Sequence, residues 1–501
     1  MKTEQAVEVE EQAAPAVDVA AQAGRGTIYI TASKLWFMVT GAALMFALPR
    51  LISEAEVGEY KVVIGLVSVI NAVVVTGTIQ TVSKFVSQTP EHADAIKQKA
   101  LMLQCLLGCG AAASFALAAP LVARALNDDA LVPYLRLAAL ITASYTFYAV
   151  FVGVLNGRKQ FLKQAALDAF YSTAKLLLIV VVAAAAGYTL SGAIAGFAAA
   201  AFAVLVVAGF TVGLRGSAGE SPVGFGGLMG FQTALIAFLL VNNLLVKTDL
   251  LIVKATISTD PAVASAAAGV YGVALDFAYT IFQIILSLTF VVFPLVSEAT
   301  FRADHEVVRG YVRQALRATL AISALPTVLI SANASEVLRL IFPSGYAAGA
   351  PALRIVAFGM LAFAVISVLT SVISSGGRPW VSVAIVAGTL ALAAGLDLML
   401  IPRLGLEGAA VATSTAMLAG SIASVAFVRA RYGTVVAWAT LGRVAVAAGA
   451  VYVASVFVPM GGVLVAAEFM GFGVLYLALL VVLGEIGAEE WGLARRILGR
   501  P

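Results

Sequence analysis

The residues of this chain that could do chemistry are a few charged side chains inside long apolar segments. Lys247 and Asp249 stand in a run of Leu, Val and Asn, and Asp276 stands among Ala, Phe and Tyr. A charge at membrane depth costs about 2.5–3.5 kcal/mol on insertion scales, so each one needs a partner or a function. Ammonium groups there would attract an anion, and carboxylates would hold a proton or a cation.

Helical spacing places further polar residues on common faces. Gln80 and Lys84 are four residues apart and Asp168 and Lys175 are seven apart, so each pair shares one face of a helix. We interpret these faces as the lining of a hydrated, partly cationic cleft. A structural interpretation stays open for both pairs, because Asp168 and Lys175 could form an ion pair. The lysines near segment ends could instead extend to the membrane interface, namely Lys34, Lys61, Lys84 and Lys254.

The segment that holds Lys247 and Asp249 presents them in different directions. At 100° per residue, Lys247 shares a face with Asn243, whereas Asp249 shares the opposite side with Asn242. A straight helix cannot direct both at one cavity, and the sequence does not decide which set faces it. The candidates for substrate binding are Lys84, Lys175, Lys247 and Gln80, and those for ion coupling or charge pairing are Asp249, Asp276 and Asp168.

Composition identifies the elements that must position these residues. Of the 501 residues, 61% are hydrophobic and 12% are charged, where a soluble domain has about 25% charged residues. The mean hydropathy is +1.00. These values exclude a soluble enzyme, a nucleic-acid-binding module and a disordered scaffold. The apolar runs are continuous over helical lengths, which excludes an outer-membrane barrel with alternating strands. The sequence predicts an all-α polytopic membrane protein.

About fourteen transmembrane helices are expected, because a spanning helix needs about 20 apolar residues. We expect a disordered cytoplasmic tail over 1–26, an N-lobe of six spans over 27–215 and a C-lobe of six spans over 228–430. Two further spans follow over 436–486, and 487–501 forms a cytoplasmic end. The expected spans are 28–52, 58–82, 98–123, 131–155, 165–186, 190–213, 230–256, 266–292, 312–333, 350–374, 380–401, 405–428, 438–458 and 462–484.

Basic residues between the spans predict the orientation. If the amino end is cytoplasmic, the cytoplasmic gaps hold more Lys and Arg than the external gaps, for example Arg158, Lys159 and Lys163 in one loop. Both termini are therefore expected on the cytoplasmic side of the plasma (inner) membrane. The net charge of +4 fits such loops and is no sign of a nucleic-acid partner.

Short motifs recur between the two halves of the chain. Gly58-Glu59-Tyr60 and Gly269-Val270-Tyr271 both occur near the start of a span, and Gly192-Ala193 and Gly408-Ala409 occur at the sixth and twelfth spans. Six crossings return a chain to the same side, so the halves are predicted to be parallel repeats. Two such lobes would enclose a central cleft and suit transport by alternating access.

The sequence offers little for catalysis. Cys105 and Cys109 lie one helical turn apart, and the two histidines, His92 and His305, are distant in sequence, so no four-ligand metal set exists. A Walker-type phosphate loop is absent from the sequence, and the external gaps are short and lack His. We expect no enzyme activity, no metal site and no cofactor.

A family resemblance extends over almost the whole chain after the tail. The chain resembles the Wzx-type polysaccharide or O-antigen flippases of the multidrug/oligosaccharidyl-lipid/polysaccharide (MOP) exporter superfamily. The residues that carry the resemblance are Gly58-Glu59-Tyr60, Ser83-Lys84-Phe85-Val86, Asp249, Gly269-Val270-Tyr271, Phe293-Pro294, Leu338 to Phe342, Tyr346, Ser374 to Arg378, Ile401-Pro402-Arg403-Leu404-Gly405 and Gly408-Ala409-Ala410-Val411-Ala412-Thr413.

The resemblance implies a flippase that moves an undecaprenyl-diphosphate-linked oligosaccharide to the outer leaflet for lipopolysaccharide or other surface polysaccharide assembly. It also implies a cationic lumen and, in some members, proton or sodium coupling. Lys84 stands where relatives often carry Arg, which keeps the charge but loses the bidentate fork. Three alternatives stay open: an ion-coupled multidrug or cation antiporter of the same superfamily, a lipid II flippase, and a non-transporting scaffold homologue. The early spans lack the dense arginine cluster expected of a lipid II flippase.

Overall fold

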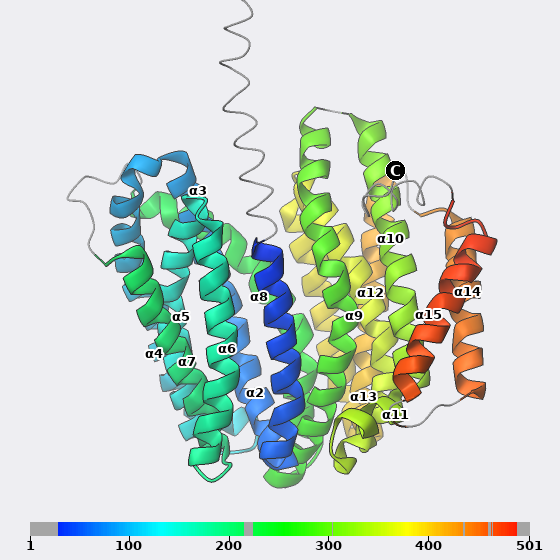
Figure 1. Ribbon diagram of the computed structural model, residues 1–501, viewed down its shortest axis with the longest axis horizontal. Coiled ribbons are helices and arrows are strands. Elements are labelled where there is room, and N and C mark those ends of the chain that lie inside the picture. Colours follow the sequence, from blue (N-terminus) through cyan, green and yellow to red (C-terminus); the bar gives the residue numbers. More distant parts are fainter. Residues whose placement is uncertain are drawn as a thin grey trace, which may run out of the picture. The chain divides into compact units, whose positions relative to one another are not determined.

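A computed structural model describes residues 29–214, 224–302, 304–433, 436–458, 462 and 464–487 (Figure 1). The expected tail over 1–26 lies outside the described residues, as does the end of the chain from 488. By internal contacts the chain divides into two compact units. Unit 1 comprises 1–52, 63–124 and 128–240, and unit 2 comprises 53–62, 125–127 and 241–501.

Unit 1 is built from the helices of the first half of the chain. Helix α2 begins in unit 2 and continues into unit 1, and the first residues of α8 also belong to unit 1. The helices are Tyr29–Leu51, α2 (Glu54–Asn71), the π-helix η1 (Ala72–Thr76), α3 (Gly77–Gln88), the 3₁₀ turn η2 (Pro90–His92), α4 (Ala93–Ala125), α5 (Leu131–Gly157), α6 (Phe161–Ala185) and α7 (Leu190–Val212).

Unit 2 contains the helices of the second half, which Figure 1 colours from green to red. They are α8 (Phe225–Thr256), α9 (Pro261–Phe301), α10 (His305–Ala332), α11 (Ala334–Ile341), the 3₁₀ segment η3 (Ser344–Gly349), α12 (Ala350–Ser375), α13 (Pro379–Tyr432), α14 (Trp438–Phe457) and α15 (Leu464–Val482).

The predicted helical membrane protein is confirmed. Among the described residues, 12 helices are long and apolar enough to cross a membrane, and Ala467–Val482 is a shorter apolar helix. Helix α13 has 54 residues and would be about 81 Å long if straight, more than twice the hydrocarbon thickness. Gly405 interrupts it with φ 60° and ψ −136°, a conformation that glycine adopts without steric cost. Helix α13 therefore supplies two of the fourteen expected spans.

Glycines allow close helix packing in unit 1. A Cβ on Gly196 of α7 would lie 2.3 Å from the carbonyl oxygen of Leu178 in α6, and one on Gly108 of α4 would lie 1.9 Å from Oγ1 of Thr146 in α5. Helices without a hydrophobic driving force between them associate through such small-residue contacts. Gly196 and Gly108 therefore allow α7 and α4 to pack closely against α6 and α5.

In unit 2, the two copies of the Gly-x-Tyr motif pack against each other. A Cβ on Gly58 would lie 1.7 Å from the carbonyl oxygen of Ser265, and one on Gly269 would lie 2.4 Å from that of Glu54. Neither position can accept a side chain without moving backbone. The glycines of the motif are thus required by the crossing of α2 and α9.

An ionic network joins α14 and α15 to α10 in unit 2. The buried carboxylate of Glu485 accepts hydrogen bonds from Arg317 Nε at 2.6 Å and Thr440 Oγ1 at 3.0 Å. Arg443 Nη1 donates to the same carboxylate at 3.3 Å. The two helices that follow the second six-span segment are therefore fixed to unit 2.

Candidate functional site

Asp168 of unit 1 is held in an interhelical ion pair. Lys34 Nζ of the first helix donates to Asp168 Oδ2 at 2.9 Å, and the hydroxyl of Tyr148 in α5 donates to Oδ1 at 3.2 Å. The structure thus pairs Asp168 with Lys34 of a different helix, where the sequence had left a pair with Lys175 open. Lys34, expected to extend to the interface, is 60% exposed but ends at this carboxylate.

Lys175 of α6 lies close to aromatic and hydroxyl groups of unit 1. Its ammonium stands 4.4 Å from the centroid of the Phe197 ring, a cation–π contact. It also lines a small hollow of about 40 Å³ together with Thr40 and Ser172. This hollow could hold water but is far too small for a sugar, so Lys175 needs a larger opening to act on substrate.

Lys84 and Gln80 lie on α3 one turn apart, as the spacing predicts. Gln80 is exposed, and Lys84 is half-buried with its ammonium 5.4 Å from the Phe85 ring centroid. Immediately before α3, Ala72–Thr76 forms a π-helix. A π-turn adds a residue to the helical repeat and is frequent at functional sites. The π-turn lies on the amino-terminal side of the face that Gln80 and Lys84 share.

Asp276 of unit 2 is paired with Lys61. The Lys61 side chain is 13% exposed, so it does not extend to the interface as one interpretation held. Lys254, which was also expected to extend to the interface, is completely buried. Its ammonium donates to Ser265 Oγ at 2.6 Å and to the Pro261 carbonyl at 3.0 Å. The turn between α8 and α9 brings these acceptors back to α8.

Asp249 lies in a buried cluster in unit 2. It is 2% exposed, and its Oδ2 accepts from the Tyr271 hydroxyl of α9 at 2.8 Å and from Thr413 Oγ1 of α13 at 3.1 Å. The backbone N–H of Leu250 donates to Oδ1 at 2.7 Å. Lys247 on the same helix is half-buried and near enough for its charge to act on Asp249.

A second carboxylate completes this cluster. Asp397 of α13 has no exposed surface, and neither of its carboxylate oxygens has a hydrogen-bond partner among the described residues. It lies near enough to Asp249 and Tyr271 for an electrostatic interaction with each. We call Asp249, Tyr271, Asp397 and Thr413 the acidic cluster.

The acidic cluster is suited to a cation. An unpaired buried carboxylate is strongly unfavourable, and two of them within interaction distance are worse, unless a proton or a cation neutralises them. Carboxylate and hydroxyl oxygens are the ligands that hard cations prefer. Within the described ranges no group of three or more His, Cys, Asp or Glu side chains could hold a metal ion. The cluster itself offers two carboxylates and two hydroxyls, groups that can hold a proton or a cation.

Three members of the cluster escaped the sequence interpretation. Asp397 is the lone acidic residue in the apolar run from Pro379 to Ile401, and the cost of such a charge is a signal that could have identified it. Tyr271 and Thr413 were known only as parts of motifs. Their meeting with Asp249 depends on which helices are neighbours, which periodicity does not report.

Comparison with known families decides the identity of the chain. The sequence profile of the family described as "Polysaccharide biosynthesis protein" matches residues 47–351, which is more than half of the chain. This chain is a member of the polysaccharide biosynthesis protein family. No curated protein matches its sequence.

Solved structures show the fold of this family member. The lipid II flippase MurJ in an inward closed conformation superposes with a TM-score of 0.75 at 13% identity, over 94% of this chain and 100% of that chain. An inward-facing multidrug resistance MATE family transporter gives a TM-score of 0.66 at 15% identity, over 79% of this chain and 94% of its own. A MOP superfamily transporter from Pyrococcus furiosus gives 0.56 at 13% identity, over 81% and 95%.

Family and fold together give a coarse assignment. The chain is a multi-pass membrane protein of the polysaccharide biosynthesis protein family, and its fold is that of the MurJ and MATE structures. The resemblance drawn from its motifs is confirmed at this level.

Proposed function

We propose that this polysaccharide biosynthesis protein is a flippase. It moves a polyprenyl-diphosphate-linked oligosaccharide, such as an O-antigen unit on undecaprenyl diphosphate, from the cytoplasmic to the outer leaflet by alternating access. A proton or sodium ion bound at the acidic cluster couples the cycle to an ion gradient. The observation that carries the coupling is the buried carboxylate of Asp397 near Asp249, which has no hydrogen-bond partner among the described residues.

The acidic cluster can link ion binding to conformation. Its members come from α8, α9 and α13, so a bound cation would draw three helices of unit 2 together. Without the cation, repulsion between two buried carboxylates favours their separation. A ligand shifts a conformational equilibrium by its difference in affinity for the two states, and this cluster offers such a difference.

The intramembrane lysines are proposed to hold the diphosphate. Lys84 and Lys175 of unit 1 and Lys247 of unit 2 are half-buried, which strengthens an ammonium–phosphate contact relative to water. Gln80 is exposed one turn from Lys84 and would donate to a sugar or phosphate oxygen. Asp168 and Asp276 act as charge partners, because Lys34 and Lys61 occupy them.

Lipid II is a second candidate substrate. The lipid II flippase MurJ covers 94% of this chain, whereas the MATE transporter covers 79%. A lipid-linked sugar therefore fits the comparison better than a soluble drug. In the Pyrococcus furiosus transporter, reverse polarity of the binding pocket suggests a different function, so pocket charge is a useful guide within this fold.

Reconstitution tests the proposal. Proteoliposomes receive a fluorescent undecaprenyl-diphosphate oligosaccharide, lipid II or a cationic dye, with and without proton and sodium gradients. Gradient-dependent movement of the oligosaccharide across the bilayer is expected. Movement of the dye alone would instead support the multidrug antiporter, and movement of none of the three would favour a scaffold.

Variants locate the substrate and ion sites. Asp249→Asn and Lys247→Ala are each expected to impair translocation without preventing membrane insertion. Asp260→Asn is the matched control, because Asp260 is exposed and its carboxylate accepts from the neighbouring backbone N–H of Ala262. Normal transport by both Asp249→Asn and Lys247→Ala would contradict the assignment.

The orientation proposal has its own test. We propose an inner-membrane protein with both termini in the cytoplasm, with lobes over 27–215 and 228–430 and two added spans over 436–486. A variant with Cys105 and Cys109 replaced by Ala would receive a single cysteine near either terminus. An impermeant maleimide should label neither cysteine in intact cells and both in permeabilised cells.

A further inference from the structure

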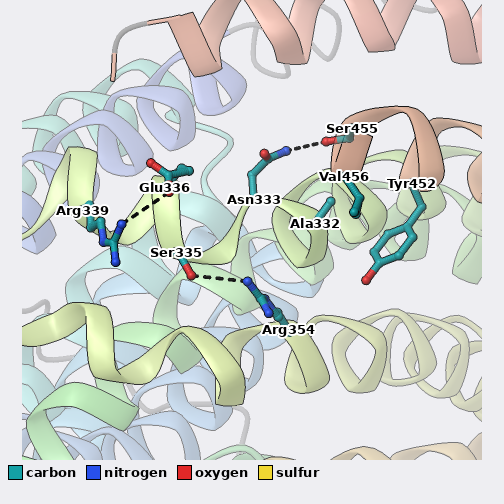
Figure 2. Close-up of a pocket in the computed structure, with 9 residues that line it drawn as sticks. All are labelled: Ala332, Asn333, Ser335, Glu336, Arg339, Arg354, Tyr452, Ser455 and Val456. Carbon is teal, nitrogen blue, oxygen red and sulfur yellow. Dashed lines mark hydrogen bonds and ion pairs between the residues drawn. The ribbon is translucent and has the colours of Figure 1, made fainter. Parts of the chain in front are cut away.

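Unit 2 contains a polar pocket that the transport proposal does not use. Its volume is about 400 Å³, within the range of small-ligand sites. The pocket lies where α10 and α14 end and where α11 and α12 begin. Figure 2 shows the side chains that line it, which are Ala332, Asn333, Ser335, Glu336, Arg339, Arg354, Tyr452, Ser455 and Val456.

An apolar groove lies near this pocket, on three of the four helices that form it. It has a volume of about 200 Å³ and is lined by α10, α12 and α14, with Leu320, Phe358 and Ala445 among its residues. Phe358 is 49% exposed although it is aromatic. On each helix one turn separates the groove from the pocket, as in the pairs Val328 and Ala332, Phe358 and Arg354, and Ala448 and Tyr452.

The charges that line the pocket favour an anion. Arg339 is neutralised by Glu336, with Nη1 and Oε1 3.6 Å apart. Arg354 donates from Nη2 to the hydroxyl of Ser335 at 3.4 Å, a long contact with a neutral group (Figure 2). Two arginines and one glutamate leave one positive charge on the lining. A guanidinium held this loosely is available for a bidentate contact with a phosphate.

A buried network fixes the polar wall of the pocket. Asn333 Nδ2 donates to Ser455 Oγ at 2.7 Å and to Glu468 Oε1 at 3.0 Å. Ser455 Oγ donates to the same carboxylate oxygen at 2.6 Å. Glu468 is itself buried and is not part of the lining. Asn333 and Ser455 are therefore held in place and do not collapse into the pocket.

We propose that pocket and groove together bind an anionic phospholipid with one phosphodiester group. The phosphate contacts Arg354 beside Ser335, and one hydrocarbon chain lies in the groove toward Leu320. The single positive charge matches one phosphodiester and falls short of a diphosphate, which separates this ligand from the proposed transport substrate.

The position of the pocket and the length of the groove agree with a phospholipid that occupies one leaflet of the bilayer. Helix ends meet the headgroup region, and this pocket is formed at helix ends. From Leu320 to Val328 the groove follows α10 for about 12 Å, at 1.5 Å per residue. This length is close to half of the hydrocarbon core, about 15 Å. A phospholipid with its phosphate in the pocket would therefore place its chain along the groove.

Native mass spectrometry of the full chain tests the site. The delipidated protein in detergent is titrated with phosphatidylglycerol and with phosphatidylcholine of the same chains. Phosphatidylglycerol is expected to remain bound at lower concentration. Arg354→Gln should weaken its binding about tenfold, because a charge-assisted contact is lost. Arg354→Lys should fall between the two, because the charge stays and the fork is lost.

Matched controls separate this site from general surface effects. Arg403→Gln removes another exposed arginine, one outside the pocket, and should leave binding unchanged. Ala445→Trp fills the groove and should weaken binding, whereas Val446→Trp, on the neighbouring exposed position, should not. Each variant is first checked for an unchanged unfolding midpoint.

Three results would overturn the proposal. One is equal retention of phosphatidylglycerol by Arg354→Gln and by the unaltered chain. Another is displacement by glycerol phosphate at equal concentration, which would show a phosphate site without a lipid chain. The third is preferred binding of undecaprenyl diphosphate, which would assign the pocket to the transport substrate. None of these readouts measures transport, so a failure here leaves the proposed flippase activity untouched.

Discussion

The acids on the apolar helices of this molecule have two opposite kinds of surroundings. Asp276, and likewise Asp168 in the other unit, each hold a lysine from another helix. Asp397 has no partner among the described residues, and its near neighbour Asp249 is bound by hydroxyls and a backbone N–H. A carboxylate with a lysine already has its counter-charge, whereas one without can take it from solution.

Among these acids, those paired with lysine have a structural role, and the one without a partner in the described part of the chain has the proposed role in ion coupling. An ion pair between helices fixes their packing, and removing one partner leaves the other charge buried. An unpaired acid costs stability in every state that lacks a cation, and that cost is what a coupling ion can relieve. The following variants are ordered by the size of their expected effect.

Asp397→Asn is expected to have the largest effect on transport. The amide keeps the shape but removes the charge that would bind a cation, so gradient-driven translocation should fall at least about tenfold. The unfolding midpoint should stay the same or rise, because an uncompensated buried charge is removed. Transport in proteoliposomes and thermal unfolding measure the two quantities. A drop in both together would show that Asp397 serves packing.

Asp276→Asn is expected to act in the opposite way. The Lys61 ammonium would stay mostly buried without its counter-charge, and stability should fall by roughly 1–3 kcal/mol, less than for a fully buried pair because Asp276 is 41% exposed. Thermal unfolding measures the loss. Exchange of the two residues, Lys61→Asp with Asp276→Lys, should recover part of it. No recovery would mean that the pair does not stabilise the crossing of α2 and α9.

The elements of this fold could be predicted from sequence, because the property that makes a span is local. Twenty apolar residues in a row identify a helix whatever surrounds it. Even the division of α13 was visible, since Pro402 and Gly405 mark the position at which the expected spans 380–401 and 405–428 meet. The helix start at Glu54 instead of 58 shows the uncertainty of boundaries.

The site could be predicted only in part, because partners come from other helices. Periodicity placed Asp168 and Lys175 on one face correctly, yet Lys34, 134 residues earlier, is the partner of Asp168. Lys254 is near the end of its helix, where a lysine usually reaches water. The turn to Pro261 supplies a carbonyl instead, and so the side chain stays inside. Asp249 was identified because several polar residues lie near it in sequence. Asp397 was missed because its neighbours in sequence are apolar.

Tyr271→Phe should produce a moderate effect on ion binding alone. The hydroxyl donates to Asp249 at 2.8 Å. Without it, the hydrogen bond that holds this carboxylate in place is lost, which costs about 1 kcal/mol. The sodium or proton concentration for half-maximal transport should therefore change by a few-fold, with the maximal rate nearly unchanged. Transport against ion concentration measures this. Thr413→Val removes a longer contact, 3.1 Å, and should have a smaller effect in the same direction.

Asp168→Asn should have the smallest effect and serves as the match to Asp276→Asn. Lys34 is 60% exposed, so it can extend into a polar environment when its partner is lost, and the new side-chain amide can still accept from the Tyr148 hydroxyl. Exposed pairs contribute about 0–1 kcal/mol, so the unfolding midpoint should change little. If Asp168→Asn destabilises the protein as much as Asp276→Asn does, the exposure of the lysine does not determine the strength of these ion pairs. The packing of the first helix would then depend on Lys34 despite the 60% exposure of this side chain.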